Sequence, residues 1–488
     1  MNSNCAVKNN AITNRNTTMD TKALRQKILD LAIHGKLVPQ DPNDEPASVL
    51  LERIKAEKER LIKEGKIKKS KKSEKTSDTP HYENVPFELP NSWVWCRLED
   101  IAYVASGSTP DKTCFVENGV PYIKMYNLRN QKIDFAYHPQ YITEEVHNGK
   151  LQRSRTEVGD LIMNIVGPPL GKLAIIPTTL PQANFNQAAV LIRPYKFKEV
   201  LVSYLKVYLE EMSEINSIAT RGSAGQVNIS LTQSQNMRIP IPPLNEVRRI
   251  IEEVSKYDIL IDSLKQNITD IQNLIAYTKS KILDLAIHGK LVPQDPNDEP
   301  AIELLKRINP DFTPCDNGHY TQLPDGWTAC RLEQVADILD NLRKPINSSE
   351  RDSRIRNRQI DELYPYYGAT GQVGLIDDYI INGNYLLLGE DGAPFLDKNA
   401  IKAYSISGKS WVNNHAHILS PKIDFEFLQY SLNQIDYSEY VNGSTRLKLT
   451  QTDMRSIKIM LPPLAEQKRI KSKIQILFSQ LDLMMESL

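Results

Sequence analysis

The sequence predicts an α+β chain in which two mixed, largely β domains are separated by two long antiparallel coiled-coil helical regions with pseudo-two-fold symmetry. Three observations support this fold class. One segment occurs twice without a change, a heptad pattern of apolar residues runs through the middle of the chain, and short β-type runs fill the two segments that flank this pattern. At 488 residues the chain is also long enough for several domains, each with its own core.

The repeat is the strongest of these signals. The segment KILDLAIHGKLVPQDPNDEPA stands at residues 27–47 and again at residues 281–301. Looser echoes accompany it: IPIPPLNEVRRI from Ile239 matches IMLPPLAEQKRI from Ile459, and CRLE follows shortly after Trp93 and again after Trp327. The chain therefore consists of two copies of one plan.

A long helix is expected at residues 244–288, because apolar residues recur there at steps of three and four. At 1.5 Å per residue it would be about 65 Å long. Pro242 and Pro243 precede it, Gly289 and Pro293 follow it, and Thr278 alone interrupts the pattern. The expected seam comprises Ile250, Val254, Tyr257, Ile261, Leu264, Ile268, Ile271, Ile275, Ile282 and Leu285.

The two ends of the chain repeat this helix in halves. The C-terminal residues from Ile470 to Leu488 follow the spacing of its first half, and the residues from Leu24 to His34 follow its second half. Together they would form a second copy, and we expect this composite helix to pair antiparallel with the central one. The alternative is that these helices are core elements of separate domains.

These patterns give six segments with different expected structures. They are a disordered tail at residues 1–20, a helical repeat with a basic linker at 21–85, a first β-rich domain at 86–243, a central helical spacer at 244–321, a second β-rich domain at 322–463, and a C-terminal helical region at 464–488.

Charge is balanced overall, with 60 Lys and Arg against 60 Asp and Glu, so no global attraction to nucleic acid is expected. Two local runs are basic. Residues 53–75 hold eleven cations against four anions, and residues 343–358 hold six against two. Such a run is either a phosphate-contacting surface or a solvated face, and the first has the composition of a mobile linker.

The sequence carries no pattern of export or of a membrane span. No run of about 18 apolar residues is present, and the first 19 residues are polar. The cysteines at positions 5, 96, 114, 315 and 330 form no C-x-x-C pair, so neither a zinc site nor a disulfide framework is indicated. We expect a cytoplasmic protein with reduced thiols and no metal site.

Several motifs that resemble catalytic signatures fail on inspection. GPPLGKL at residues 167–173 is one residue short of a phosphate-binding loop and has Leu where Ser or Thr would hold magnesium. The Pro168-Pro169 pair has no preceding Asn or Asp, so a tight loop at a strand end is expected. Glu390 and Asp391 lie among Gly and Pro residues typical of a turn. His34 and His288 fit helix ends, where the dipole favours a cation.

With the PPL-x-E-x-x-R-I helix starts at residues 242–250 and 462–470, the duplicated KILDLAIHGKLVPQ, SGSTP at 106–110, GDLIMNIVGPPLGK at 159–172 and PYYGATGQVG at 365–374, the chain resembles the specificity subunits of type I restriction-modification systems. The resemblance extends over nearly the whole chain from about Thr21. It implies two target-recognition domains that each read one half of a split DNA site, with helices that set the distance between them.

The resemblance also implies partners and cofactors. We expect double-stranded DNA, two modification subunits and two restriction subunits as partners, with adenine methylation and DNA cleavage performed by those subunits. S-adenosylmethionine, ATP and Mg²⁺ are expected in the partner subunits and no cofactor or catalytic residue in this chain. Two linked heads make the second half-site contact effectively intramolecular, which agrees with this reading.

Candidate DNA-contacting residues are polar or basic side chains in loops, because base edges and phosphates require hydrogen-bonding or cationic partners. The best candidates occupy equivalent Gly-rich loops, one before the helix start at residues 242–250 and one before the helix start at residues 462–470. They are Arg221, Ser223, Gln226 and Asn228 in the first domain, and Ser444, Thr445, Arg446 and Lys448 in the second. Further candidates are Tyr122 and Lys124 in the first domain, and Arg343, Lys344, Tyr366, Tyr367 and Gln372 in the second.

Two other function classes remain open at this point. A self-contained DNA methylase or nuclease would need cofactor or metal motifs that the sequence does not display, and binding of S-adenosylmethionine by the chain alone would support it. A coiled-coil scaffold without DNA binding would explain the helices but not two dissimilar β-rich domains.

Overall fold

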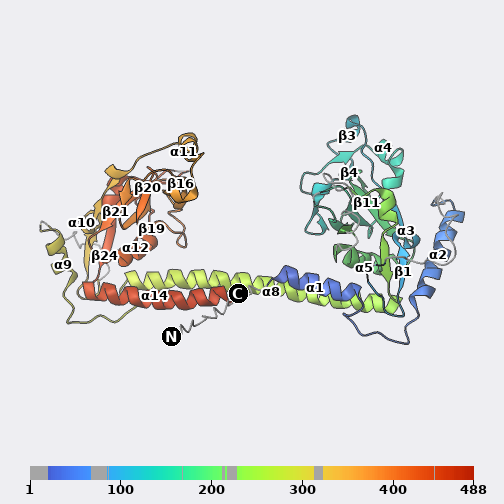
Figure 1. Cartoon of the computed structure of the whole chain (residues 1–488), viewed down its shortest axis with the longest axis horizontal. Coiled ribbons are helices and arrows are strands. Elements are labelled where there is room, and N and C mark those ends of the chain that lie inside the picture. The colour runs from blue at the N-terminus through green and yellow to red at the C-terminus, as the bar shows by residue number, and fades with distance from the viewer. Residues whose placement is uncertain are drawn as a thin grey trace, which may run out of the picture. The chain divides into compact units, whose positions relative to one another are not determined.

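The structure is a computed structural model of the whole chain, with two compact units that divide between Gln266 and Asn267. The residues that it describes are 20–67, 85, 87–167, 169–211, 215–216, 228–310, 312, 323–443 and 446–488. The predicted tail therefore lies outside the described residues, except for Asp20. Figure 1 shows in each unit a sheet-rich domain next to long helices.

The predicted central helix is present as α8 (Leu244–Ile287), which is 44 residues long and contributes its first part to one unit and its second part to the other. Thr278 does not interrupt it, because its hydroxyl donates to the Leu274 carbonyl oxygen at 2.8 Å, one turn back in the helix. The expected seam is only partly buried. Tyr257 and Ile271 are 37% and 41% exposed, so the prediction that they pack in the seam is wrong.

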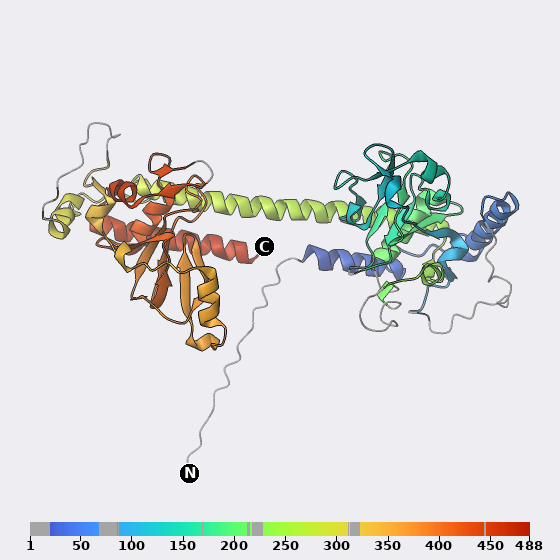
Figure 2. The ribbon, with the colours of Figure 1, turned by 90° about the horizontal axis from the view of Figure 1, so that it is seen from above.

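In the unit of residues 20–266, the helix α1 (Thr21–Ile33) lies antiparallel to the first part of α8 (Figure 2). Arg25 pairs with Asp258 of α8 at 2.9 Å and with Glu210 of α5 (Lys198–Glu211) at 2.7 Å. Buried apolar side chains of both helices, including Ile28 and Ile250, belong to one core. The amphipathic pattern at the N-terminal end of the chain thus correctly predicted a helix that packs against the central one.

In the unit of residues 267–488, the helix α14 (Leu464–Glu486) lies antiparallel to the second part of α8 (Figures 1 and 2). Asp482 forms an ion pair with Lys279, whose amine also lies 5.3 Å from the Phe478 ring centroid. Ile282 of α8 shares a core with Ile470 of α14. Each unit therefore has a helical frame made of one terminal helix and a part of α8.

The first sheet-rich domain, here called the first head, occupies residues 94–241 and contains two four-stranded sheets. Its main sheet has the order β2 (Ala102–Ser106), β11 (Ala189–Pro194), β8 (Leu161–Asn164), β9 (Leu173–Ile175). The other has the order β10 (Asn184–Phe185), β4 (Val120–Ile123), β7 (Tyr141–Ile142), β3 (Phe115–Val116). Strands β5 (Leu128–Arg129) and β6 (Lys132–Ile133) form a small hairpin, and α3 (Leu98–Ile101), α4 (Glu144–Asn148) and α7 (Leu231–Gln235) complete the domain.

The second head occupies residues 328–461. Its main sheet has the order β14 (Ala336–Ile338), β21 (Ala416–Pro421), β18 (Tyr385–Gly389), β19 (Ala403–Ile406). The other sheet has the order β16 (Gly371–Ile376), β15 (Tyr364–Gly368), β20 (Lys409–Val412), β17 (Ile381–Asn382). Strands β22 (Val441–Asn442) and β23 (Lys448–Leu449) pair, and α10 (Leu332–Val335), α11 (Ser348–Ile355), α12 (Phe425–Gln434) and α13 (Gln451–Ser456) complete the domain.

The two heads share strand pairings although their sequences differ. In the main sheets, Ala102 lies opposite Pro194 and Ala336 lies opposite Pro421 in the same antiparallel arrangement. The other sheets each contain one parallel pair, β10 with β4 and β20 with β15. The heads are therefore two versions of one domain, and positions in one can be compared with positions in the other.

The first basic run is not a linker along its whole length. Residues 53–63 belong to the helix α2 (Ala47–Lys63), in which Leu50 and Ile54 are buried against the first core and basic and acidic side chains share the outer face. Arg60 pairs with Glu57 and Glu64 on that exposed face. Apolar residues at helical spacing outweighed the linker-like composition there, and residues 68–75 lie outside the described residues.

The duplicated segment has the same conformation in both units. Gly35 and Gly289 adopt φ values of 63° and 66°, which favour glycine. A Cβ atom on Gly35 would lie 2.6 Å from Pro90 Cγ, and one on Gly289 would lie 2.6 Å from Pro324 Cγ. Close approach to the head and a left-handed backbone thus both require glycine at the end of the frame helix.

We predict that Gly35→Ala lowers the free energy of unfolding by about 3 kcal/mol, because it combines a strained φ with a steric clash. The matched control is Gly65→Ala, where φ is 71° but no atom lies within 4 Å of the new Cβ; it should cost about 1 kcal/mol. Urea denaturation of the full chain measures both. Equal losses in the two variants would contradict the clash.

Candidate nucleic-acid interface

Each head joins its helical frame through a two-stranded neck. In the first head, β1 (Val94–Arg97) pairs antiparallel with β12 (Arg238–Ile241), and only Pro242 and Pro243 separate β12 from α8. In the second head, β13 (Thr328–Arg331) pairs with β24 (Lys458–Leu461), and Pro462 and Pro463 separate β24 from α14. The entry strand and the exit strand of each head therefore end at the same point on the frame.

A buried glutamate lies at that point in the first unit. Glu246, in the first turn of α8, is 1% exposed, and its carboxylate accepts a hydrogen bond from the indole N–H of Trp93 at 3.0 Å. It accepts a second from the Gln40 amide at 2.5 Å. Beside it, Arg249 of α8 pairs with Asp44 at 2.6 Å. We call these five residues the first neck cluster; they connect the head, the frame helix and the duplicated loop.

The second unit has the same cluster. Glu466, in the first turn of α14, is fully buried and accepts hydrogen bonds from the Trp327 indole at 3.0 Å and from the Gln294 amide at 3.2 Å. Arg469 pairs with Asp298 at 2.6 Å. These five residues form the second neck cluster. The helix-start echo and the duplicated loop are thus the two sides of one contact, which sequence comparison alone did not reveal.

Burial and ion pairing shift the titration of these groups in opposite directions. Burial raises the pKa of the Glu246 and Glu466 carboxyls above the usual value for glutamate. The hydrogen bond from Arg249 lowers the pKa of the Asp44 carboxyl, and the same pair raises the pKa of the Arg249 guanidinium. The glutamates are therefore held at a cost in desolvation, which two hydrogen bonds and the nearby arginine partly offset.

In each head a loop follows the main-sheet strand that is second in chain order, β8 in the first head and β18 in the second. The described loop residues are 165–167 and 169–170 in the first head and 390–395 in the second. Val166 forms an isolated antiparallel bridge with Asn228, and Asp391 forms the corresponding bridge with Lys448. We predicted that the loops before the two PPL helix starts are equivalent. Asn228 and Lys448 indeed form corresponding bridges in the two heads. Asn228 is exposed, and the Lys448 side chain is 52% exposed.

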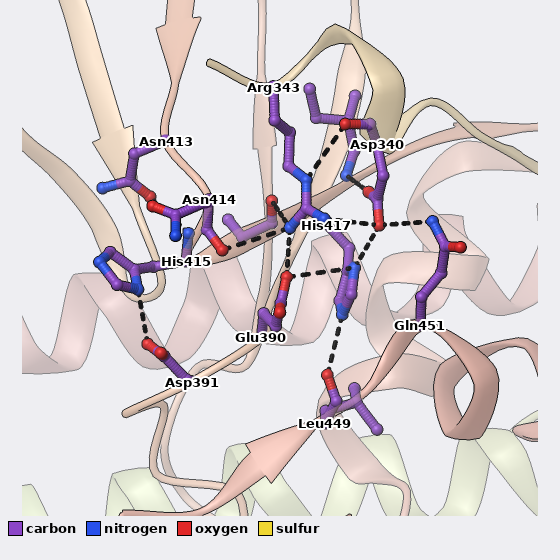
Figure 3. Close-up of polar contacts among 12 residues, drawn as sticks. Asp340, Arg343, Glu390, Asp391, Asn413, Asn414, His415, His417, Leu449 and Gln451 are labelled. Atoms are coloured by element: carbon purple, nitrogen blue, oxygen red, sulfur yellow. Dashed lines mark hydrogen bonds and ion pairs between the residues drawn. The ribbon is translucent and has the colours of Figure 1, made fainter. Parts of the chain in front are cut away.

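In the second head this loop is part of a charged network (Figure 3). The Asp340 carboxylate accepts from His417 Nδ1 at 2.7 Å and from the Gln451 amide at 2.9 Å. Glu390 forms an ion pair with Arg343 and lies 3.2 Å from the Lys448 amine. The network therefore connects residues that follow β14 and β18 of the main sheet with β23, the strand that precedes α13.

The ring of His417 is fully buried and has an acceptor at each nitrogen. Nδ1 faces Asp340, and Nε2 lies 3.0 Å from the Leu449 carbonyl oxygen. Burial alone would raise the pKa of the Asp340 carboxyl, but hydrogen bonding and charge from His417, together with Arg343, hold that pKa below its usual value.

The outer edge of this network is exposed. Asp391 lies 2.7 Å from Arg446 and 2.7 Å from His415 Nδ1, and the Arg446 side chain is 62% exposed. Gly392 has a φ of 71°, so the turn predicted for this acidic segment is confirmed. Among the described residues, no group of three or more His, Cys, Asp or Glu side chains is arranged to hold a metal ion.

The corresponding loop of the first head is neutral. The side-chain amide of Asn164 donates to the carbonyl oxygens of Val166 and Pro169 at 3.0 and 2.9 Å, and its oxygen accepts from the Lys172 backbone N–H at 2.6 Å. Of the predicted tight loop, Pro169 is thus held by one asparagine, whereas Pro168 lies outside the described residues. The two heads therefore place different chemistry on equivalent scaffolds.

Two predicted DNA contacts lie in the core instead. Tyr122 is fully buried and donates to the Ser108 carbonyl oxygen at 2.9 Å, and Tyr366 is 4% exposed and donates to the Ile346 carbonyl oxygen at 3.3 Å. Tyr122 lies on β4 and Tyr366 on β15, and each of these strands belongs to the parallel pair of its sheet. The two residues are therefore structural counterparts. The expectation that they reach DNA is corrected, because strand alternation turns these rings inward.

Arg343 is also committed within the head. Its guanidinium is paired with Asp340 and Glu390, donates to the Asn414 and Ala416 carbonyl oxygens at 3.3 Å, and is 15% exposed. The candidates among the described residues that are exposed or partly exposed are Lys124, Asn228, Lys344, Tyr367, Gln372, Arg446 and Lys448. Arg221, Ser223, Gln226, Ser444 and Thr445 lie outside the described residues.

Sequence inspection missed two groups of cations held against aromatic rings. In the first head, Arg129 lies 4.0 Å from the centroid of the Tyr137 ring, and Asn130, Gln131 and His138 nearby have positive φ values. Such strain often accompanies functional loops. In the second head, Arg354 of α11 lies 5.0 Å from the Trp411 centroid. The only sequence signal was the basic run at residues 343–358.

We predict that Asp340→Asn lowers the free energy of unfolding by about 3 kcal/mol near neutral pH, because it removes one of the two carboxylates that face the buried Arg343 guanidinium. The folded pKa of Asp340 is lowered, so its stabilisation is complete above the unfolded pKa of about 3.9 and is lost as the pH falls through the folded value. The difference between wild type and variant in urea denaturation should therefore shrink below about pH 4.

Asp352→Asn is the control for that measurement, because the Asp352 side chain is 63% exposed and should contribute little. A gap between Asp340→Asn and wild type that stays constant down to acid pH would contradict the assigned ionisation.

Comparison with known proteins places the chain in a family. The model of the type I restriction modification DNA specificity domain matches residues 90–273 and 324–488. The EcoAI specificity subunit of Escherichia coli is 30% identical and aligns over 93% of this chain and 88% of its own length. The EcoEI specificity subunit of Escherichia coli is 28% identical over 94% of this chain and 89% of its own length.

A solved structure has the same fold. A chain from the work titled "Structural basis underlying complex assembly and conformational transition of the type I R-M system" aligns with a TM-score of 0.50 at 19% identity, over 82% of this chain and 93% of that chain. No helix among the described residues is long and apolar enough to cross a membrane. The matched residues include both heads and most of the frame, and the chain belongs to the family of type I restriction-modification specificity subunits.

Proposed function

We propose that this chain reads a bipartite DNA site, with one half-site for each head, and directs adenine methylation and cleavage by partner subunits. The observation that carries the proposal is the pair of identical neck clusters beneath two heads whose loops differ in chemistry. A frame that is the same twice is suited to hold two readers in the same way. Heads with different loops are suited to different half-sites.

The helical frame supports a spacer role. A continuous helix at 1.5 Å per residue is stiff over the length of α8, and it contributes to both units. We propose that α1 and α14 together continue the antiparallel pairing along α8 with pseudo-two-fold symmetry, as the repeat suggests. The distance between half-sites would then follow from helix length, as half-site spacing follows from geometry in dimeric DNA-binding proteins.

The proposed DNA contacts are exposed or partly exposed polar side chains of each head. Lys124 and Asn228 serve the first head, and Lys344, Arg446 and Lys448 serve the second, together with Gln372. Lysine and arginine suit phosphates and guanine edges, whereas Asn and Gln suit adenine. Arg446 and Lys448 are held by Asp391 and Glu390 in the free protein, which keeps them in place near the exposed edge of the network.

The partner assignments follow from the family. We propose that two modification subunits and two restriction subunits assemble on the chain in the cytoplasm, and that they bind S-adenosylmethionine, ATP and Mg²⁺. Chemistry at the base and at the phosphodiester then belongs to the partners, and this chain supplies the choice of site. Two copies of the frame suit two copies of one partner.

The first test is a long-read map of base modification in the host genome, with and without the gene for this chain. We expect deletion to remove methylation from one split motif and so to reveal both half-sites. Persistence of every methylated motif in a host whose partner subunits are expressed would contradict the proposal.

A second prediction concerns the spacer. Insertion of one heptad after Gln266 lengthens α8 by about 10 Å, or about three base pairs at 3.4 Å each. Methylation assays with synthetic duplexes should then show a longer preferred spacer and unchanged half-sites. Changed half-sites with an unchanged spacer would exclude the helix as the spacing element.

A further inference from the structure

The attachment of each head to its frame has one part that is the same in both units and one part that differs. The differing part is a contact between a head helix and a frame helix. In the first unit Arg25 of α1 pairs with Glu210 of α5, and in the second Lys471 of α14 pairs with Glu426 of α12. The shared part is the neck cluster, with the same residue types in the same roles.

The strands of the neck also have the same register. Val94 lies opposite Ile241 and Arg97 opposite Arg238, while Thr328 lies opposite Leu461 and Arg331 opposite Lys458. The head is thus presented to its frame helix by the same backbone geometry in both units. If either head rotated about its neck, the tryptophan would move away from the glutamate. The tryptophan directly precedes the entry strand of the head, whereas the glutamate belongs to the frame helix.

The chemistry of the cluster suits orientation better than cohesion. Burying a carboxylate between neutral donors costs desolvation energy, a cost that a cluster made entirely of matched apolar groups would not carry. Hydrogen bonds to an indole N–H and an amide are directional, whereas apolar contacts tolerate rotation. A glutamate at this position therefore specifies an angle between head and helix in a way that an apolar residue would not.

We propose that the two neck clusters are positioning devices that fix the angle of each head on its frame helix and thereby the spacer lengths that the protein accepts. The inference rests on the proposed bipartite readout and adds the residues that limit its tolerance. Glu246 and Glu466 are the central positioning residues, and their partners Trp93 and Trp327 directly precede the entry strands of the heads. They act through the orientation of the heads and make no contact with DNA.

The experiment uses the full chain assembled with its modification subunits and a panel of duplexes. The duplexes carry both native half-sites, taken from the genomic map, at the native spacer and at spacers one and two base pairs shorter or longer. The variants are Glu246→Gln, Glu466→Gln and the two combined, since glutamine keeps the shape but turns an N–H₂ group toward a donor. Glu252→Gln is the matched control on the exposed face of α8.

We expect wild type and Glu252→Gln to methylate the native spacer and to discriminate against the others. Each neck variant should keep the same half-site preference but lose about tenfold in discrimination against spacers one base pair away, as expected for one directional hydrogen bond to a charged group. The combined variant should lose more. A purely stabilising role would lower activity on all spacers equally and leave the ratio between spacers unchanged.

Gln40→Ala provides a milder variant, because Gln40 is exposed and donates only one of the two hydrogen bonds to Glu246. If the glutamine variants fail to fold, a widened spacer profile in Gln40→Ala still supports the proposal. An unchanged profile in every folded variant overturns it, as does an altered half-site preference. If wild type itself methylates no split site, the proposed function fails and the inference falls with it.

Discussion

A buried carboxylate that accepts an indole N–H is the interaction on which the architecture of both units depends. Glu246 and Glu466 lie in the first turn of a frame helix, where the helix dipole favours a negative charge. Each receives a donor from the neck of its head and another from the duplicated loop. Removing either partner would leave a polar group buried without a hydrogen bond, so head, helix and loop are held as one assembly.

This constraint separates the part of the molecule that must stay the same from the part that can vary. The main sheets of the two heads share their strand order, the neck strands share their register, and the neck clusters have the same contacts. The loops beyond the main sheets are not bound by that requirement. One is fastened by the amide of Asn164, and the other contains a network around Asp340 and His417. A common scaffold with different loop chemistry is what two different half-sites would require.

Much of the fold was predictable because it is encoded locally. Helical periodicity predicted α8, α1 and α14, and the unchanged repeat predicted two related units. The candidate contacts were harder to predict. Tyr122 and Tyr366 have side chains that suit either a core or a nucleic acid, and only the direction in which their strand faces shows that they are core residues. Arg343 suits a phosphate equally well, but it pairs with Asp340 three residues earlier and with Glu390 on a distant segment.

The sequence by itself determined the duplicated plan, the long central helix and the family, because these depend on residue identity and spacing along the chain. Only the tertiary structure shows which contacts the repeated residues make. Gln40 and Glu246 are 206 positions apart, and no helical or strand periodicity relates residues at that separation. They meet only when the neck returns the chain to its frame. The same applies to the carboxyl of Asp340, whose lowered pKa depends on His417, 77 positions away, which only folding brings within hydrogen-bond distance.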